Sequence, residues 1–175
     1  AAIWGPTSGG KTSYVESDFI PEYDKIYCVS EPVRKQVIAR FPELADRTEV
    51  LLNFIDIKQV QRRSEEPLSD PQYTGELKFL TVGRASEEKG YDIAVQITAE
   101  LKKRGLCFKW FIIGDGRDLN KLRTMAKEYQ VEQEIIFLGM RENPAPYVKS
   151  CDLYLQPSRH EGYPITIVEA RSLQK

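Results

Sequence analysis

Histidine and cysteine are scarce in this chain of 175 residues. It has one histidine, His160, and three cysteines, Cys28, Cys107 and Cys151. A single imidazole excludes any site that needs several histidine ligands. Three widely spaced cysteines without a C-x-x-C motif indicate neither a disulfide framework nor a zinc site. We therefore expect each cysteine to be a small, buried apolar residue of a protein in a reducing compartment.

The sequence also lacks long apolar runs and an excess of charge of either sign. No run approaches the roughly 20 residues of a membrane-spanning helix, and the first residues lack the pattern of a secretory signal. Lysine and arginine number 25 against 26 acidic residues, for a net charge of -1. This balance and the scattered aromatic residues argue against a nucleic-acid partner. We expect a cytoplasmic location, with the inner face of the membrane as an alternative if parts outside this chain attach it there.

From Lys78 onward, short apolar segments alternate with amphipathic ones. This pattern predicts an α/β fold with a Rossmann-like parallel sheet covered by helices on both faces. Such sheets bind ligands at the carboxyl ends of their strands, where the sequence places most of its notable glycines. We expect strands at residues 79–82, 108–113, 134–138 and 153–155, and helices at 91–104, 118–130, 144–150 and from Ile165 onward.

The first 75 residues have a different pattern. They predict a strand at residues 25–29, a helix at 31–41 and another strand at 48–52. The polar stretch 62–75, which contains prolines and glycine, is typical of a linker or surface loop.

The segment Gly83–Gly90, which reads GRASEEKG, joins a predicted strand to a predicted helix. Its two cations, Arg84 and Lys89, lie five residues apart. Fixed positive charge, glycine and a helix N-terminus are the features that bind a diphosphate. Because short charged loops are common, the spacing alone favours an ordinary solvated loop over a diphosphate site.

A second segment, Glu161–Glu169, has two carboxylates that flank the start of the last helix. Glu161 could accept hydrogen bonds from sugar hydroxyls, and backbone N–H groups within residues 162–165 could donate to a ligand. Glu169, about one turn inside the helix, could bind the two hydroxyls of a ribose. The alternative is that Glu161 is a surface residue and Glu169 a buried residue paired with backbone.

Four motifs in order resemble the carboxy-terminal domain of glycosyltransferase family 4, which has the GT-B fold. They are V-G-R-x4-K-G, I-I-G-D-G, F-x-G and P-S-x-x-E-G-x6-E-A, and all four are complete between residues 82 and 170. Residues 27–30 and 50–56 also resemble the end of the family's first domain and its crossover. The resemblance implies that residues 1–75 end an amino-terminal, acceptor-side domain and that residues 76–175 form the donor-binding domain. The chain stops at Lys175, where the family's domain continues, so we expect a truncated fragment that is inactive alone.

The family resemblance also implies an activity, which is transfer of a sugar from a UDP- or GDP-sugar to a glycan, lipid or small-molecule acceptor. Family members retain the configuration of the sugar and need no metal or other cofactor. This chain has no Asp-x-Asp motif, and an Arg/Lys pair can supply the charge that magnesium would have supplied. The implied catalytic residues are Arg84, Lys89 and Glu161, and the implied donor-binding residues are Gly83, Gly114, Gly139, Met140, Arg141, Gly162, Tyr163, Pro164, Ile165 and Glu169.

Two other functions remain open from the sequence. The segment Gly5–Thr12 fits G-x4-G-K-[ST], the phosphate loop of nucleoside triphosphatases. A true phosphate loop follows a buried strand and opens a long helix, whereas only four residues precede this segment and Pro21 limits the helix that could follow. A non-catalytic module that only binds nucleotide sugars is the third alternative.

Overall fold

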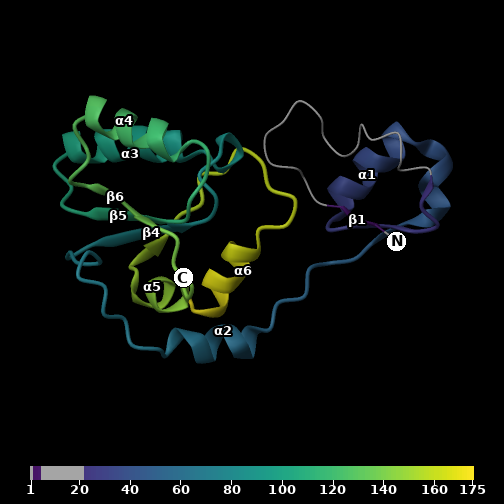
Figure 1. Ribbon diagram of the computed structural model, residues 1–175, viewed down its shortest axis with the longest axis horizontal. Coiled ribbons are helices and arrows are strands. Elements are labelled where there is room, and N and C mark those ends of the chain that lie inside the picture. The colour runs from purple at the N-terminus through teal and green to yellow at the C-terminus, as the bar shows by residue number, and fades with distance from the viewer. Residues whose placement is uncertain (1, 5–21) are drawn as a thin grey trace. The chain divides into compact units, whose positions relative to one another are not determined.

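The computed structural model describes residues 2–4 and 22–175 (Figure 1). Its contacts divide the chain into two compact units. The first unit comprises residues 1–54 together with 160–165, and the second comprises residues 55–159 together with 166–175. The chain therefore passes from the second unit to the first at residue 160 and returns to the second at residue 166, just after the last helix begins.

The first unit contains a parallel sheet of three strands in the order β1-β2-β3. Buried aliphatic residues, among them Ile26, Val33 and Val37, form its core. Arg34 links the helix to the sheet, because its Nε donates to the carbonyl of Thr48 at 2.8 Å. The two strands and the helix expected here are confirmed as β2 (Ile26–Cys28), α1 (Glu31–Arg40) and β3 (Thr48–Val50). The strand β1 (Ala2–Trp4) and the 3-10 helix η3 (Pro42–Arg47) were not expected from the sequence.

The second unit contains a parallel sheet of four strands in the order β6-β5-β4-β7. From β4 the chain first adds strands on one side, and then returns to place β7 on the other side of β4. The strand order therefore reverses between β4 and β7. The carboxyl ends of these two strands form the topological switch point, which is where open α/β sheets bind ligands. The strands are β4 (Lys78–Val82), β5 (Lys109–Ile113), β6 (Ile135–Gly139) and β7 (Leu153–Tyr154).

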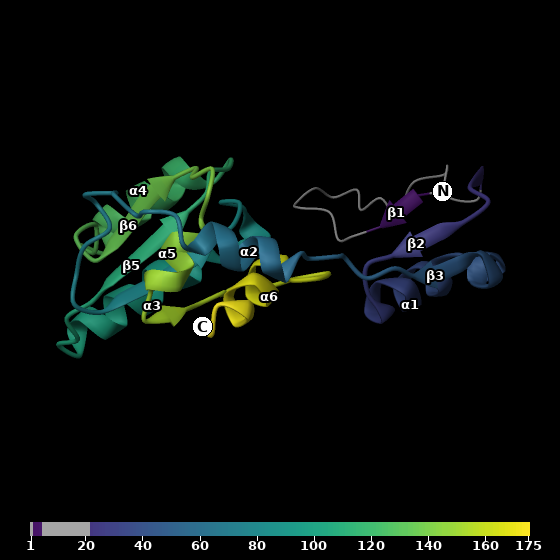
Figure 2. The same cartoon turned by 90° about the horizontal axis from the view of Figure 1, so that it is seen from below.

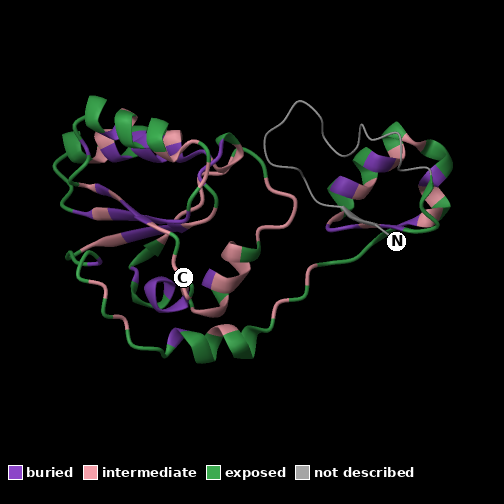
Figure 3. Cartoon of the chain, viewed as in Figure 1, coloured by how far each residue is buried: buried purple, intermediate pink, exposed green. Residues whose placement is uncertain are grey.

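Helices cover both faces of this sheet, as the alternation of strand side chains requires (Figure 1). Phe79, Trp110 and Ile112 point to the face covered by α3 and α4. Leu80 and Phe111, the neighbours of these residues, point to the face covered by α5 and α6. The Rossmann-like α/β fold is therefore confirmed, and Figure 3 shows that the central strands are mostly buried whereas α3 and α4 have an exposed outer face. The helices are α3 (Tyr91–Lys103), α4 (Leu119–Glu128), α5 (Ala145–Ser150) and α6 (Ile165–Ser172).

One helix of the second unit was not expected from the sequence. Helix α2 (Ile57–Ser64) extends three residues into the stretch 62–75 that was predicted to be a linker or surface loop. Asp56 caps its N-terminus by accepting a hydrogen bond from the amide of Gln59 at 3.0 Å. The helix packs against α5 (Figure 2). Val60 and Ser64 are its less exposed positions, a stripe too narrow for the sequence to have revealed.

A buried chain of hydrogen bonds crosses the sheet through Thr81. The indole N–H of Trp110 donates to the Thr81 hydroxyl at 2.9 Å, and this hydroxyl donates to the carbonyl of Leu155 at 2.7 Å. Trp110 and Thr81 are almost fully buried. Strands β5 and β4 and the end of β7 are thus joined by side-chain bonds as well as by the backbone ladder.

We expect the substitution Thr81→Val to destabilise the second unit by about 1–3 kcal/mol, because it leaves the Trp110 N–H buried without an acceptor. Thr98→Val is the matched control. Thr98 is equally buried, but its hydroxyl bonds only the carbonyl of Ala94 one helical turn before it. Urea denaturation of both variants measures the difference, and equal losses of stability would contradict the role assigned to Thr81.

Candidate functional site

The loop Gly83–Gly90 leaves the end of β4 at the switch point of the sheet. Arg84 is exposed and Lys89 is half-buried, so neither cation belongs to the core of the second unit. The loop is anchored to the neighbouring turn after β5. The amide of Gly83 donates to the carbonyl of Ile113, and that of Ala85 donates to the carbonyl of Asp115, both at 2.9 Å.

Glycine allows the turn after β5 to lie directly against this loop. A Cβ atom at Gly114 would lie 1.9 Å from the carbonyl oxygen of Gly83, and the φ of Gly114 is 139°. A Cβ atom at Gly116 would lie 2.3 Å from the carbonyl oxygen of Ala85. No side chain fits in either gap, so the two backbone segments are in direct contact.

The segment after β7 holds the same loop from its other end. At Gly90, where φ is 64°, a Cβ atom would lie 2.1 Å from the carbonyl oxygen of Pro157. The amide of Arg159 donates to the carbonyl of Glu88 at 2.8 Å. Backbone on two sides therefore fixes the course of the loop between Arg84 and Lys89, which is the kind of support that keeps a binding site preorganised.

Arg159 also holds this region with its side chain. Its guanidinium donates to both carboxylate oxygens of Asp92, at 2.7 and 2.6 Å, and to the carbonyl of Glu87 at 3.0 Å. The hydrogen bonds from Arg159 are the main reason why the pKa of Asp92 lies below its ordinary value. Sequence reasoning missed this pair, because its members lie 67 positions apart and Arg159 occupies an unspecified position of its motif.

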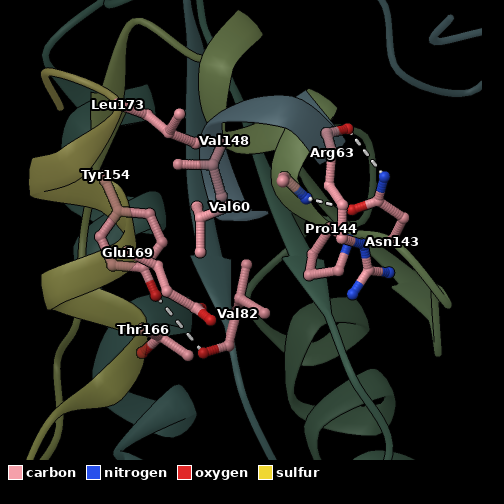
Figure 4. A pocket seen from close by; sticks show the side chains of 11 residues that line it. Val60, Arg63, Val82, Asn143, Pro144, Val148, Tyr154, Thr166, Glu169 and Leu173 are labelled. Atoms are coloured by element: carbon pink, nitrogen blue, oxygen red, sulfur yellow. Dashed lines mark hydrogen bonds between the residues drawn. The ribbon is translucent and has the colours of Figure 1, made fainter. Parts of the chain in front are cut away.

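Glu169 lies on α6 beside a pocket of the second unit (Figure 4). Burial raises the pKa of its carboxyl group, and the positive charge of Arg63 opposes that shift. Within the described residues, no group donates a hydrogen bond to this carboxylate. The pocket is lined by residues in or next to α2, α5 and α6 and at the ends of β4 and β7, namely Val60, Arg63, Val82, Asn143, Pro144, Ala145, Val148, Tyr154, Thr166, Glu169 and Leu173.

The turn after β6, which was expected to contact the base, has its own supports. The carbonyl of Gly139 accepts a hydrogen bond from the amide of Gly114 at 2.9 Å, and Met140 is 70% exposed. The Arg141 guanidinium donates twice to the carboxylate of Asp70, at 3.1 and 2.8 Å. Although burial opposes ionisation of Asp70, the hydrogen bonds from Arg141 help to hold its pKa below the ordinary value.

The Arg141 side chain thus fastens the segment before β4 to the end of β6. Helix α2 is fastened to the same turn, since Arg63 donates to the carbonyl of Glu142 at 2.8 Å and Asn143 donates to the carbonyl of Arg63 at 2.9 Å. The Arg141 guanidinium also donates to the carbonyls of Leu138 and Met140, at 2.5 and 3.1 Å, so contact between this turn and a base stays a prediction. None of the long-range links had a signal in the sequence, because they join segments far apart along the chain.

The predicted site residues fall into both units. Gly83, Arg84, Lys89 and Gly114 lie together at the switch point of the second unit. Glu161 and residues 162–165 belong to the first unit, where Tyr163 packs against the aliphatic core. The start of α6 at Ile165 agrees with the expected helix. The convergence of Glu161 with the two cations stays a prediction.

Three further expectations concern features beyond these loops. The phosphate-loop-like segment Gly5–Thr12 lies outside the described residues. Within residues 2–4 and 22–175, no helix combines the length and apolar character needed to cross a membrane. The same part of the chain contains no group of three or more His, Cys, Asp or Glu side chains arranged to hold a metal ion.

Comparison with known proteins gives the class of this chain. The family described as Glycosyl transferases group 1 matches residues 63–175, and the chain belongs to that family. An uncharacterized glycosyltransferase of Methanocaldococcus jannaschii is 30% identical over 157 residues, which are 87% of this chain and 38% of the relative. The chain thus spans about two fifths of that relative's length.

Solved structures of GT-B glycosyltransferases share the fold. TarM of S. aureus, in a mutant form in complex with Fondaparinux, alpha-GlcNAc-glycerol and UDP, superimposes with a TM-score of 0.76 at 14% identity. The match covers 99% of this chain and 35% of TarM. HepE of Anabaena in complex with UDP-glucose has a TM-score of 0.71 at 20% identity, over 87% of this chain and 43% of HepE.

Proposed function

We propose that the protein is a retaining, metal-independent glycosyltransferase of family 4. It transfers a sugar from a UDP- or GDP-sugar to a glycan, lipid or small-molecule acceptor. The observation that carries this proposal is the loop Gly83–Gly90, which is held by backbone on two sides at the switch point and bears Arg84 and Lys89. The proposal places the enzyme in the cytoplasm, at the inner face of the membrane where the acceptor is a lipid.

The two cations have the chemistry that the departing diphosphate requires. Negative charge grows on the leaving diphosphate as the bond to the sugar breaks. Arginine offers paired N–H donors and lysine a compact charge, and both stabilise that negative charge best when they are fixed in advance. In our proposal Arg84 and Lys89 fill this role, so no metal ion is needed at the diphosphate.

In our proposal, each of the remaining site residues binds a different part of the donor. Glu161 and the amides of Gly162 and Tyr163 position the sugar, Glu169 accepts hydrogen bonds from the ribose, and the backbone near Gly139 contacts the base. The half-buried carboxylate of Glu169 supports its role, because such a group gains from hydroxyl donors that a ligand brings. TarM bound to UDP and HepE bound to UDP-glucose, which have the same fold, support a uridine nucleotide as the first candidate.

The experiment that tests this function is a calorimetric screen of UDP, GDP, ADP and their sugars, first without metal and then with magnesium. We expect metal-independent binding of one nucleoside diphosphate. Arg84→Ala should weaken it by about 1.5–3 kcal/mol, the usual effect of losing a charged hydrogen-bonding partner. Lys11→Ala, in the phosphate-loop-like segment, should leave it unchanged. Binding of ATP or GTP alone, dependent on magnesium and on Lys11, would instead favour a phosphate-loop protein.

A further inference from the structure

Arg159 connects the segment after β7 to the loop that bears the two cations. Its backbone amide donates to the carbonyl of Glu88 at 2.8 Å, and its guanidinium donates to the carbonyl of Glu87 at 3.0 Å. The same guanidinium donates two hydrogen bonds, of 2.7 and 2.6 Å, to the carboxylate of Asp92 in the first turn of α3. Residues on both sides of Lys89 are thus bonded to one arginine.

This arrangement restrains the loop more than an ordinary surface ion pair would. An isolated exposed pair contributes little, because each long side chain loses freedom for a weak attraction in water. Here the pair is bidentate, which adds direction to the attraction, and the same arginine also bonds two successive backbone carbonyls. The backbone of residues 87–92 is therefore held in one shape, and with it the base of the Lys89 side chain.

We propose that Arg159 and Asp92 form a positioning pair that holds the loop Gly83–Gly90 in the shape that binds the diphosphate of the donor. Neither side chain needs to touch the ligand in this role. The inference rests on the proposed function and names residues that the four motifs leave unspecified. Arg159 is also the last residue of the second unit before the segment that carries Glu161, so the pair fixes the point where that segment begins.

The sign of one substitution distinguishes positioning from direct contact. Asp92 carries a negative charge near the proposed diphosphate site. If Arg159 bound the phosphates itself, Asp92→Ala would free its guanidinium, remove a repelling charge and strengthen binding of the anion. If the pair positions the loop, Asp92→Ala must weaken binding, as Arg159→Ala does, and the double variant should be little worse than either single one.

The test is calorimetric titration of the chain with UDP and with UMP, or with GDP and GMP where the first screen selects guanine. We expect Arg159→Ala and Asp92→Ala each to weaken UDP binding about fivefold or more and to change UMP binding much less, because the loop serves the diphosphate. Arg159→Lys should be intermediate, since it keeps the charge but not the bidentate pair.

Arg104→Ala is the matched control. It removes a second arginine that pairs with an acid of α3, Glu100 at 2.9 Å, at the end of the helix away from the loop, and should leave UDP binding unchanged. Thermal unfolding of each variant shows that it is folded at the temperature of the titration. Equal losses for UDP and UMP, unchanged UDP binding in the variants, or tighter binding by Asp92→Ala would each overturn the inference. A parent chain that binds no nucleoside diphosphate would refute the proposed function, and this inference with it.

Discussion

Replacing Gly114 by alanine should destabilise the second unit by about 3 kcal/mol or more, the sum of overpacking and backbone strain. The added Cβ atom would lie 1.9 Å from the carbonyl oxygen of Gly83, at a φ of 139° that side chains rarely adopt. The neighbour is backbone, held by its own hydrogen bond from the Gly83 amide to Ile113, so it cannot turn aside as a side chain would. The loop that bears Arg84 and Lys89 would have to move instead, and nucleotide binding should be lost with it.

Gly105→Ala is the control for this variant. Gly105, which follows α3, also has a positive φ of 78°, but nothing lies within 4 Å of its Cβ position. Its replacement therefore carries only the conformational penalty of a left-handed residue, about 1 kcal/mol. Chemical denaturation of both variants separates steric contact from strain. If Gly114→Ala were no more destabilising than Gly105→Ala, the result would contradict the close contact between Gly114 and the backbone of Gly83.

The sheet of the second unit could be predicted because its signals are local. Each strand is a short apolar run that ends at a glycine or a proline, and each long helix carries apolar residues on one face. The alternation of Phe79 and Thr81 with Leu80 and Val82 along β4 then assigns residues to the two faces without further information. Helix α2 escaped prediction because Val60 is almost its only inward apolar residue.

The supports of the candidate site could not be predicted, because they join distant segments. In the sequence, Arg159 occupies a position that the motif leaves unspecified, between a serine and a histidine. Asp92 is an ordinary acidic residue in the first turn of a predicted helix. Only the strand order, which brings β7 beside β4, places the two together. The same holds for Asp70 and Arg141, which are 71 positions apart. A motif can therefore identify the residues that face a ligand while leaving out those that hold them.

The substitution Glu169→Gln should weaken nucleoside diphosphate binding and stabilise the free protein at neutral pH. Binding falls by about 1.5–3 kcal/mol, because hydrogen bonds from the proposed ribose hydroxyls to a charged acceptor become bonds to a neutral amide. Stability rises because burial disfavours the ionised carboxylate, as the raised pKa of Glu169 indicates. A residue that served only the fold would not show these opposite effects.

The difference in stability between the parent and Glu169→Gln should change with pH in a definite direction. A carboxyl group whose pKa is higher in the folded protein than its ordinary 4.5 binds its proton more tightly when folded. The parent therefore loses stability relative to Glu169→Gln as the pH rises from 4.5 through the folded pKa, and the difference is constant above that window. Urea denaturation across this range should show the two proteins converging in acid. Glu128→Gln, an exposed change on α4, should show no such trend. A Glu169→Gln variant that binds as tightly as the parent, or that is less stable than it at neutral pH, would remove Glu169 from the proposed donor site.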